Sequence, residues 1–177
     1  ANRLVEARAD LDASVWHLEE IRSALGAAFS QARMYTLAGT LLDRGDLLSG
    51  APFQLLPAAI ADYDAAIGLF RRLSEKSVEL PDDWRRTLAR LHLQRGVAKH
   101  RISPSSLAAP LEDYDTAIRH LDDLKSKLGE GFPNIWQHQL AHAYYNRGLA
   151  REAASGPEAA ADDYEAAVSD LDMLLGR

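Results

Sequence analysis

The sequence contains no cysteine, which excludes disulfide bonds, thiol catalysis and metal centres held by cysteine. It has no apolar run near the roughly 20 residues that span a bilayer, and no signal-peptide pattern at its start. It also lacks a surplus of basic residues, since its net charge is −6. An acidic chain is poorly suited to nucleic acid or to anionic lipid. We therefore expect a cytoplasmic protein with neither a nucleic-acid partner nor a membrane partner.

What the sequence does contain is a balance of 47% apolar and 26% charged residues, which is typical of a globular protein. Its thirty alanines, and its 16 arginines against four lysines, favour a bacterial source with a GC-rich genome. The first residues already follow a helical pattern. We therefore expect the chain to be part of a larger protein.

An acidic residue followed by an aromatic residue or a leucine recurs through the chain at a nearly constant interval. The four acids stand 52, 51 and 50 residues apart: Asp10, Asp62, Asp113 and Asp163. A second motif, which runs from Leu-Ala to Arg-Gly, occurs at 37–45, 88–96 and 140–148, at intervals of 51 and 52. Two independent motifs that share one period indicate a structural repeat.

Both halves of each repeat follow the period of an α-helix. The clearest apolar stripe has alternating steps of four and three residues: Leu107, Leu111, Tyr114, Ile118 and Leu121. Such spacing places the side chains on one face of a helix. Helix-breaking segments at 49–52, 103–106 and 155–157 separate the two halves, and no stretch alternates with period two for long enough to predict a strand. We predict an all-α fold of about seven helices.

The predicted helices form about 3.5 repeats in one domain that spans 1–177. Residues 1–26 are a lone second helix, and 27–80, 81–131 and 132–177 each hold a first and a second helix. Repeat arrays bury apolar faces between neighbouring units, and their terminal units normally carry a polar outer face. The last predicted helix is not followed by a polar capping helix. Either the parent protein continues, or this end associates with another chain.

Small and aromatic residues recur at fixed places in the predicted helices. The second helices carry Ala-x3-Tyr-x2-Ala, or a close variant, ending at Ala66, Ala117 and Ala167. In the first helices an alanine stands seven residues before Gly45, Gly96 and Gly148. This pattern resembles the tetratricopeptide repeat (TPR) family, in a variant whose period is about 51 rather than 34 residues. The resemblance implies a right-handed α-solenoid of antiparallel helix pairs, in which small residues let helices approach and tyrosine fills the groove between neighbouring pairs.

Each Arg-Gly motif ends a first helix, and each acid-aromatic motif lies early in the following second helix. In a helical hairpin these places approach each other, which predicts a charge-assisted pair in every unit. The expected pairs are Arg44 with Asp62, Arg95 with Asp113, and Arg147 with Asp163. A catalytic carboxylate would have no reason to recur once per repeat. We therefore interpret the pairs as structural and expect no enzyme activity.

His138 and His142 stand one helical turn apart, the spacing that zinc proteases use in the motif His-Glu-x-x-His. Gln139 occupies the place of the catalytic glutamate, and an amide cannot take a proton from metal-bound water. A third ligand is not evident nearby. We expect neither a metal nor a cofactor, and two alternatives stay open for the histidines: contact with a ligand, or a plain surface pair.

The TPR resemblance implies a concave groove lined by the first helices. The residues that it places there are Tyr35, Asp43, Arg86, Arg90, Gln94, His138, His142, Tyr145 and Asn146. Such a mixture of aromatic, basic and amide groups is typical of protein-binding surfaces. Arg86 and Arg90 suit an acidic segment of a partner, or they merely make their helix soluble.

Together these patterns favour a protein–protein interaction module that holds a peptide or helix of a partner, with an acidic segment as one option. The alternative is a structural spacer or oligomerisation segment of a larger multidomain signalling or effector protein. A segment of that kind has no groove ligand and self-associates through its exposed terminal helices.

Overall fold

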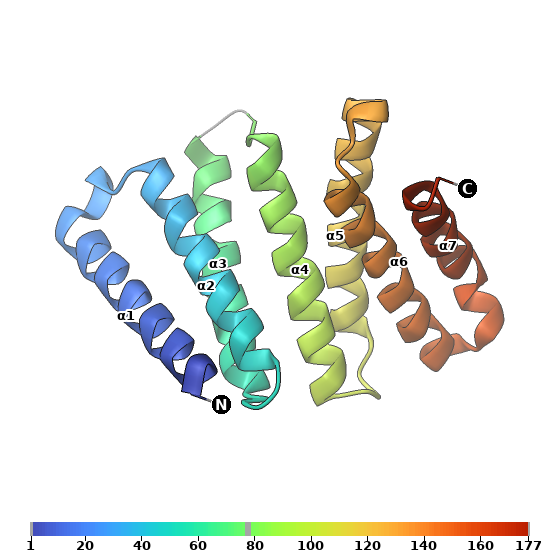
Figure 1. Cartoon of the computed structure of the whole chain (residues 1–177), viewed down its shortest axis with the longest axis horizontal. Helices are drawn as coiled ribbons and strands as arrows, with labels where there is room; N and C mark the ends of the chain where they lie inside the picture. Colours follow the sequence, from blue (N-terminus) through green and yellow to red (C-terminus); the bar gives the residue numbers. More distant parts are fainter. Residues whose placement is uncertain (1, 77–78, 177) are drawn as a thin grey trace. The chain divides into compact units, whose positions relative to one another are not determined.

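The computed structural model describes residues 2–76 and 79–176, and these residues contain seven α-helices, three short 3-10 helices and no strand. The predicted all-α fold with seven helices is confirmed. The α-helices, labelled in Figure 1, are α1 (Asn2–Leu25), α2 (Gln31–Ser49), α3 (Leu56–Lys76), α4 (Asp82–Ile102), α5 (Ala108–Leu128), α6 (Asn134–Ser155) and α7 (Ala161–Leu174). Within the described ranges, none of these helices combines the length and apolar character needed to cross a bilayer.

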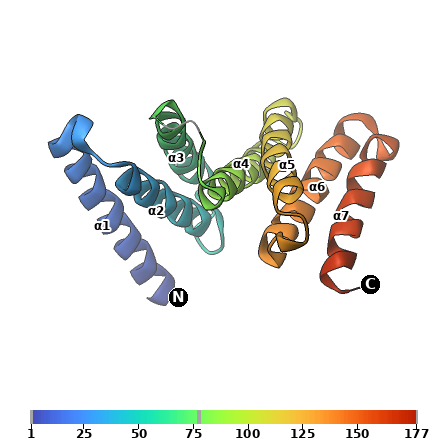
Figure 2. The same cartoon turned by 90° about the horizontal axis from the view of Figure 1, so that it is seen from above.

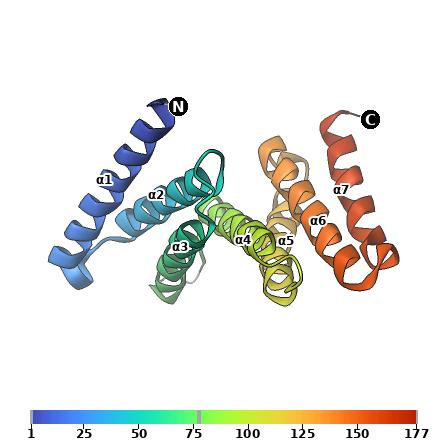
Figure 3. The same cartoon turned by 90° about the horizontal axis from the view of Figure 1, so that it is seen from below.

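The chain divides into two compact units, Ala1–Leu80 and Pro81–Arg177. In the first unit α2 lies between α1 and α3 and contacts both (Figure 2). In the second unit α4 contacts α5, α6 contacts α5 and α4, and α7 contacts α6 (Figure 3). The most extensive contacts join α2 with α3, α4 with α5 and α6 with α7, which are the predicted helix pairs. That residues 1–177 act as one domain stays a prediction.

The helix ends carry recognisable signals in the sequence. Ser30 caps α2, because its side-chain oxygen accepts a hydrogen bond from the backbone nitrogen of Arg33 at 3.3 Å. α5 and α6 end where Gly129 and Gly156 take φ angles of 55° and 93°, a region that glycine adopts without steric cost. Short connections then turn the chain back, so consecutive helices within each unit run antiparallel (Figure 1).

In every pair, a tyrosine ring of the second helix lies directly on a glycine of the first. The contacts are Gly45 with Tyr63, Gly96 with Tyr114, and Gly148 with Tyr164. A Cβ atom on these glycines would come within 2.5, 2.7 and 2.6 Å of the tyrosine Cε1 atom. Any larger residue would therefore force the tyrosine ring or the helices to shift. The predicted close approach of helices through small residues is confirmed.

The core of the second unit shows how one pair stacks on the next. Buried side chains of α5 form one cluster with side chains at the start of the following pair: Tyr114, Ile118 and Leu121 with Phe132, Trp136 and Leu140. Tyr114 therefore contacts Gly96 within its own pair and also joins the core between neighbouring pairs. The second contact is the one that the TPR resemblance implies for this tyrosine.

Candidate binding groove

The Arg-Gly and acid-aromatic motifs meet in all three pairs, as predicted. The arginine Nη2 atom lies 2.6, 2.5 and 2.5 Å from an aspartate oxygen in Arg44–Asp62, Arg95–Asp113 and Arg147–Asp163. All three aspartates are buried. A buried carboxylate needs an opposite charge to offset the cost of its desolvation, so each pair fixes the two helices of its hairpin to each other.

Two of these arginines also reach a second acid, on the preceding second helix. Arg44 Nη1 lies 3.2 Å from Asp12 Oδ1 of α1, and Arg147 Nη1 lies 2.7 Å from Asp115 Oδ1 of α5. Each of them thereby joins its own pair to the helix before it. This link was not predicted, although the sequence holds a signal for it. An acid stands two residues after every motif aspartate: Asp12, Asp64, Asp115 and Glu165.

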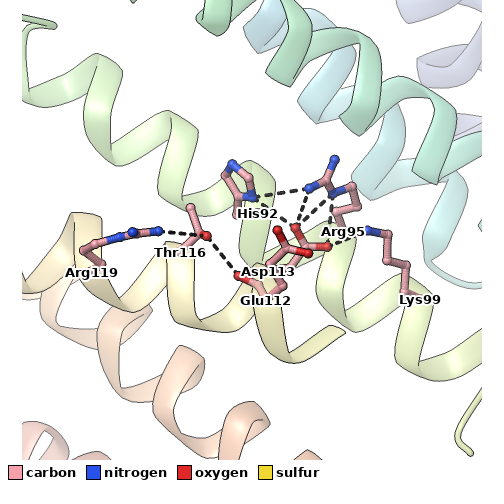
Figure 4. Close-up of polar contacts among 7 residues, drawn as sticks. All are labelled: His92, Arg95, Lys99, Glu112, Asp113, Thr116 and Arg119. Atoms are coloured by element: carbon pink, nitrogen blue, oxygen red, sulfur yellow. Dashed lines mark hydrogen bonds and ion pairs between the residues drawn. The ribbon is translucent and has the colours of Figure 1, made fainter. Parts of the chain in front are cut away.

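Asp113 has the largest set of polar partners among the motif aspartates (Figure 4). His92 Nδ1 lies 3.0 Å and Lys99 Nζ 2.9 Å from its carboxylate, which also receives Arg95. Burial raises the pKa of Asp113, but its hydrogen bonds with these three side chains outweigh burial and lower the pKa to about 2. Such a carboxylate is a poor proton acceptor at neutral pH. The cluster joins α4 to α5.

The predicted groove residues are distributed over both units. In the first unit Tyr35 is half-buried, with its ring 6.1 Å from the ring of Phe70, and Asp43 is exposed on α2. In the second unit Arg90 and Gln94 are half-buried on α4. None of these four side chains lines the groove described below.

Arg86, the remaining predicted residue on α4, packs against α6. Its Cζ atom lies 5.9 Å from the ring centre of Trp136, and its Nε atom is buried without a hydrogen-bond partner among the described residues. A guanidinium over an indole ring is stabilised by the negative face of the ring. Arg86 therefore contributes to the contact between α4 and α6.

The structure brings three predicted residues together on α6. His138, His142 and Tyr145 line a groove of about 540 Å³ between α6 and α7, and we call it the α6–α7 groove. The α7 wall includes three residues that were not predicted: Tyr164, Val168 and Leu171. Their signal in the sequence is an apolar stripe, but the same stripe forms the core in the earlier second helices.

Asn146 was predicted for the same surface but lies outside the groove lining. Its Nδ2 atom donates a hydrogen bond to the backbone oxygen of His142 at 2.7 Å. The side chain therefore folds back onto its own helix.

Two polar groups of the groove, His142 and Tyr164, are uncharged at neutral pH. Burial lowers the pKa of His142, and the nearby His138 lowers it further, so His142 is neutral at pH 7. The Tyr164 hydroxyl donates to Glu152 Oε2 at 2.5 Å, and this hydrogen bond raises the pKa of Tyr164 to about 12. In residues 2–76 and 79–176, no three side chains of metal-ligating type gather into a site. The groove therefore suits apolar side chains.

No model of a protein family matches the chain, and no curated protein matches it significantly. Its candidate site is therefore defined by its own geometry and by the internal repeat.

Proposed function

We propose that the chain is a TPR-like protein–protein interaction module that binds a segment of a partner protein in the α6–α7 groove. The observation that carries this proposal is an open apolar groove lined by three first-helix residues that the TPR resemblance selects: His138, His142 and Tyr145. Contiguous exposed apolar surface on a folded domain marks interaction sites. The proposed module has a binding role and no catalytic role.

The physical basis of binding is the burial of apolar surface on rigid helices. Val168 and Leu171 are 57% and 42% exposed, and covering such side chains contributes about 25 cal/mol for each Å² of apolar area. The helices that carry them are already folded, which lowers the ordering cost of association. An acidic partner finds less support, because Arg86 is engaged with Trp136. The cytoplasmic location, the bacterial source and the larger parent protein stay predictions.

The test is a selection of displayed peptides on the immobilised chain, with helical and extended peptides in one library. Selected peptides should bind Leu171→Asp at least about tenfold more weakly than the parent chain, since a charge then lies in the groove. Ile135→Asp is the matched control, because Ile135 is an exposed apolar residue of α6 outside the groove lining. Circular dichroism should show the same helix content in both variants. A failure to select peptides, or equal binding to both variants, would contradict the proposal.

A second candidate function is self-association, which the exposed apolar side chains of α1 favour. These side chains are those of Leu4, Val5, Trp16, Ile21 and Leu25. Sedimentation velocity should then show concentration-dependent dimers that Trp16→Asp disrupts. A chain that stays monomeric at every concentration would rule this function out.

A further inference from the structure

The internal repeat shows what covers a surface like the α6–α7 groove elsewhere in the chain. Each residue of α4 corresponds to the residue of α6 that lies 52 positions later, as Gly96 corresponds to Gly148. Each residue of α5 corresponds to the residue of α7 that lies 50 positions later, as Asp113 corresponds to Asp163. By these intervals the groove residues Tyr145, Val168 and Leu171 correspond to Leu93, Ile118 and Leu121.

In the α4–α5 pair, the equivalent surface is covered by α6. Leu93, Ile118 and Leu121 are only 2%, 5% and 1% exposed, because they share one core cluster with Trp136 and Leu140 of α6. Their counterparts in the α6–α7 groove are 49%, 57% and 42% exposed. The two surfaces are alike in their apolar character and differ in whether a helix covers them.

α6 therefore describes the kind of helix that fits the groove. Its Trp136 and Leu140, four residues apart, contribute to the cluster with the α4–α5 surface. Four residues further on, the Tyr144 hydroxyl donates to Asp122 Oδ2 of α5 at 2.7 Å. Three residues beyond that, Arg147 pairs with Asp115 of α5, as described above.

α7 carries acids at both places where such a helix needs a polar partner. Asp115 and Asp122 of α5 correspond to Glu165 and Asp172 of α7. Both α7 acids are exposed and line a second hollow, which shares Tyr164 and Val168 with the groove. Neither acidic side chain forms an ion pair or hydrogen bond with another described residue. They are placed to receive a tyrosine and a cation from outside.

We propose that the α6–α7 groove binds an amphipathic helix of a partner protein with a defined spacing of side chains. The helix carries an aromatic residue, a leucine four positions later, a tyrosine after four more and an arginine after a further three. Its apolar side chains cover Val168 and Leu171, while its tyrosine and arginine meet Asp172 and Glu165. This inference rests on the proposed function and names the ligand of the same groove.

A second copy of the chain does not supply such a helix. Its first helices α2, α4 and α6 are already packed, because each contacts the second helix of its own pair. Two α7 helices packed together would bring Glu165 and Asp172 of both copies near one another, and like charges at an interface oppose association. A helix with a basic residue at the stated place has the complementary charge.

The experiment uses a fluorescent, end-capped peptide with the sequence of residues 132–149 and the full chain as receptor. Fluorescence anisotropy should show saturable binding that weakens at least about tenfold in Val168→Asp and in Leu171→Asp. Ile135→Asp in the chain is the control and should bind the peptide as the parent chain does. A peptide with Trp136→Ala and Leu140→Ala should bind at least about tenfold more weakly to the parent.

A charge exchange tests the orientation of the helix. Glu165→Arg in the chain should weaken binding of the parent peptide several-fold, and Arg147→Glu in the peptide should restore it. Both changes are at exposed or peptide positions, so the fold of the receptor is kept. Equal affinity in all four combinations would overturn the placement of the arginine beside Glu165.

The outcomes separate this inference from the proposed function. If library peptides depend on Leu171 but lack the stated spacing, and the 132–149 peptide does not bind, the inference is overturned and the function stands. If no peptide depends on Leu171, both are overturned. If the parent chain dimerises, Leu171→Asp makes it monomeric and the peptide competes with dimerisation, then a second copy is the occupant and the partner helix is overturned.

Discussion

Three equivalent tyrosines place their hydroxyl groups in different settings. Tyr63 donates to Asp46 Oδ1 at 2.9 Å, and Tyr164 donates to Glu152. In the second pair Val97 stands at the place of Asp46, and the Tyr114 hydroxyl is buried without a hydrogen-bond partner among the described residues. A buried polar group in that state costs about 1–3 kcal/mol. The motif places the tyrosine ring at the same position in each repeat, but the hydrogen bonding of the hydroxyl group depends on the residues around it.

Tyr114→Phe should therefore leave the free energy of unfolding unchanged or raise it by up to about 1 kcal/mol, because the ring stays and the unpaired hydroxyl is lost. Tyr63→Phe is the matched control and should lower that free energy by about 1 kcal/mol, since it removes a hydrogen bond. Urea unfolding followed by circular dichroism measures both. Equal losses in the two variants would show that the Tyr114 hydroxyl does have a partner in solution.

The motif glycines differ in how much room their tyrosines have to move. Gly96→Ala should lower the free energy of unfolding by about 2 kcal/mol, because overpacking of a core costs this much and Tyr114 is fully buried. Gly148→Ala should cost less, since Tyr164 is half-buried beside the open groove and can shift. Gly39→Ala meets no atom within 4 Å and should stabilise α2 by about 0.5–1 kcal/mol. Thermal unfolding that ranks the three variants otherwise would contradict these contacts.

At the scale of helices, the arginine at the end of a first helix connects more elements than the repeat pattern suggests. Arg147 of α6 contacts Asp163 of α7 and Asp115 of α5. Asp163 is buried and has one further partner, Arg151, whose Nη1 atom lies 3.1 Å from Asp163 Oδ2. Loss of Arg147 therefore leaves a buried carboxylate only partly compensated.

Arg147→Met should lower the free energy of unfolding by about 2–3 kcal/mol, because it keeps the aliphatic stem but removes the charge beside a buried acid. Arg151→Met and Asp115→Ala are the controls, and each should cost less than Arg147→Met, because the side chains of Arg151 and Asp115 are 36% and 53% exposed against 15% for Arg147. Chemical unfolding measures the three variants. If Arg147→Met costs no more than Arg151→Met, then the arginine does not connect the helices as its distances indicate.

At the scale of the whole molecule, the response to acid depends on individual buried groups more than on the net charge of −6. Burial is the main reason that the pKa of His120 falls from 6.5 to about 4. The neighbouring charges lower it further with one exception: His92, Arg85 and Arg119 lower the pKa, and Asp123 raises it. The folded chain therefore takes up this proton at lower pH than the unfolded chain does.

The melting temperature should fall as the pH is lowered from about 6.5 to about 4, because the unfolded state then binds a proton that the folded state excludes. Below about pH 4 it should fall again, since the pKa of Asp113 is 3.8 when unfolded and about 2 when folded. His120→Gln should flatten the decline between pH 6.5 and 4. His17→Gln, at an exposed position on α1, should leave it unchanged. An identical decline in both variants would contradict the role of His120.

The sequence by itself determined the helices, their pairing and the ion pairs inside each hairpin. These features are local: an apolar stripe of period 3.6 selects a helix, and a short connection brings neighbouring helices together. A motif that recurs at one interval repeats the same contacts, so the ion pair of Arg44 with Asp62 and its two equivalents follow from the pattern, whereas the contact of each tyrosine ring with the glycine of its own pair was seen only in the structure. The TPR resemblance also selected three residues of the candidate groove, His138, His142 and Tyr145, which helical spacing puts on one face.

Only the tertiary structure decided which of two similar surfaces is open. Ile118 and Val168 occupy equivalent places in the repeat, but α6 covers the first and the second is exposed. Likewise, Arg86 and His138 are equivalent, yet Arg86 stacks on Trp136 while His138 lines the groove. The sequence of a repeat specifies a surface that can accept a helix. Whether a helix lies there depends on how one pair packs on the next, because burial is a property of the neighbour as much as of the residue.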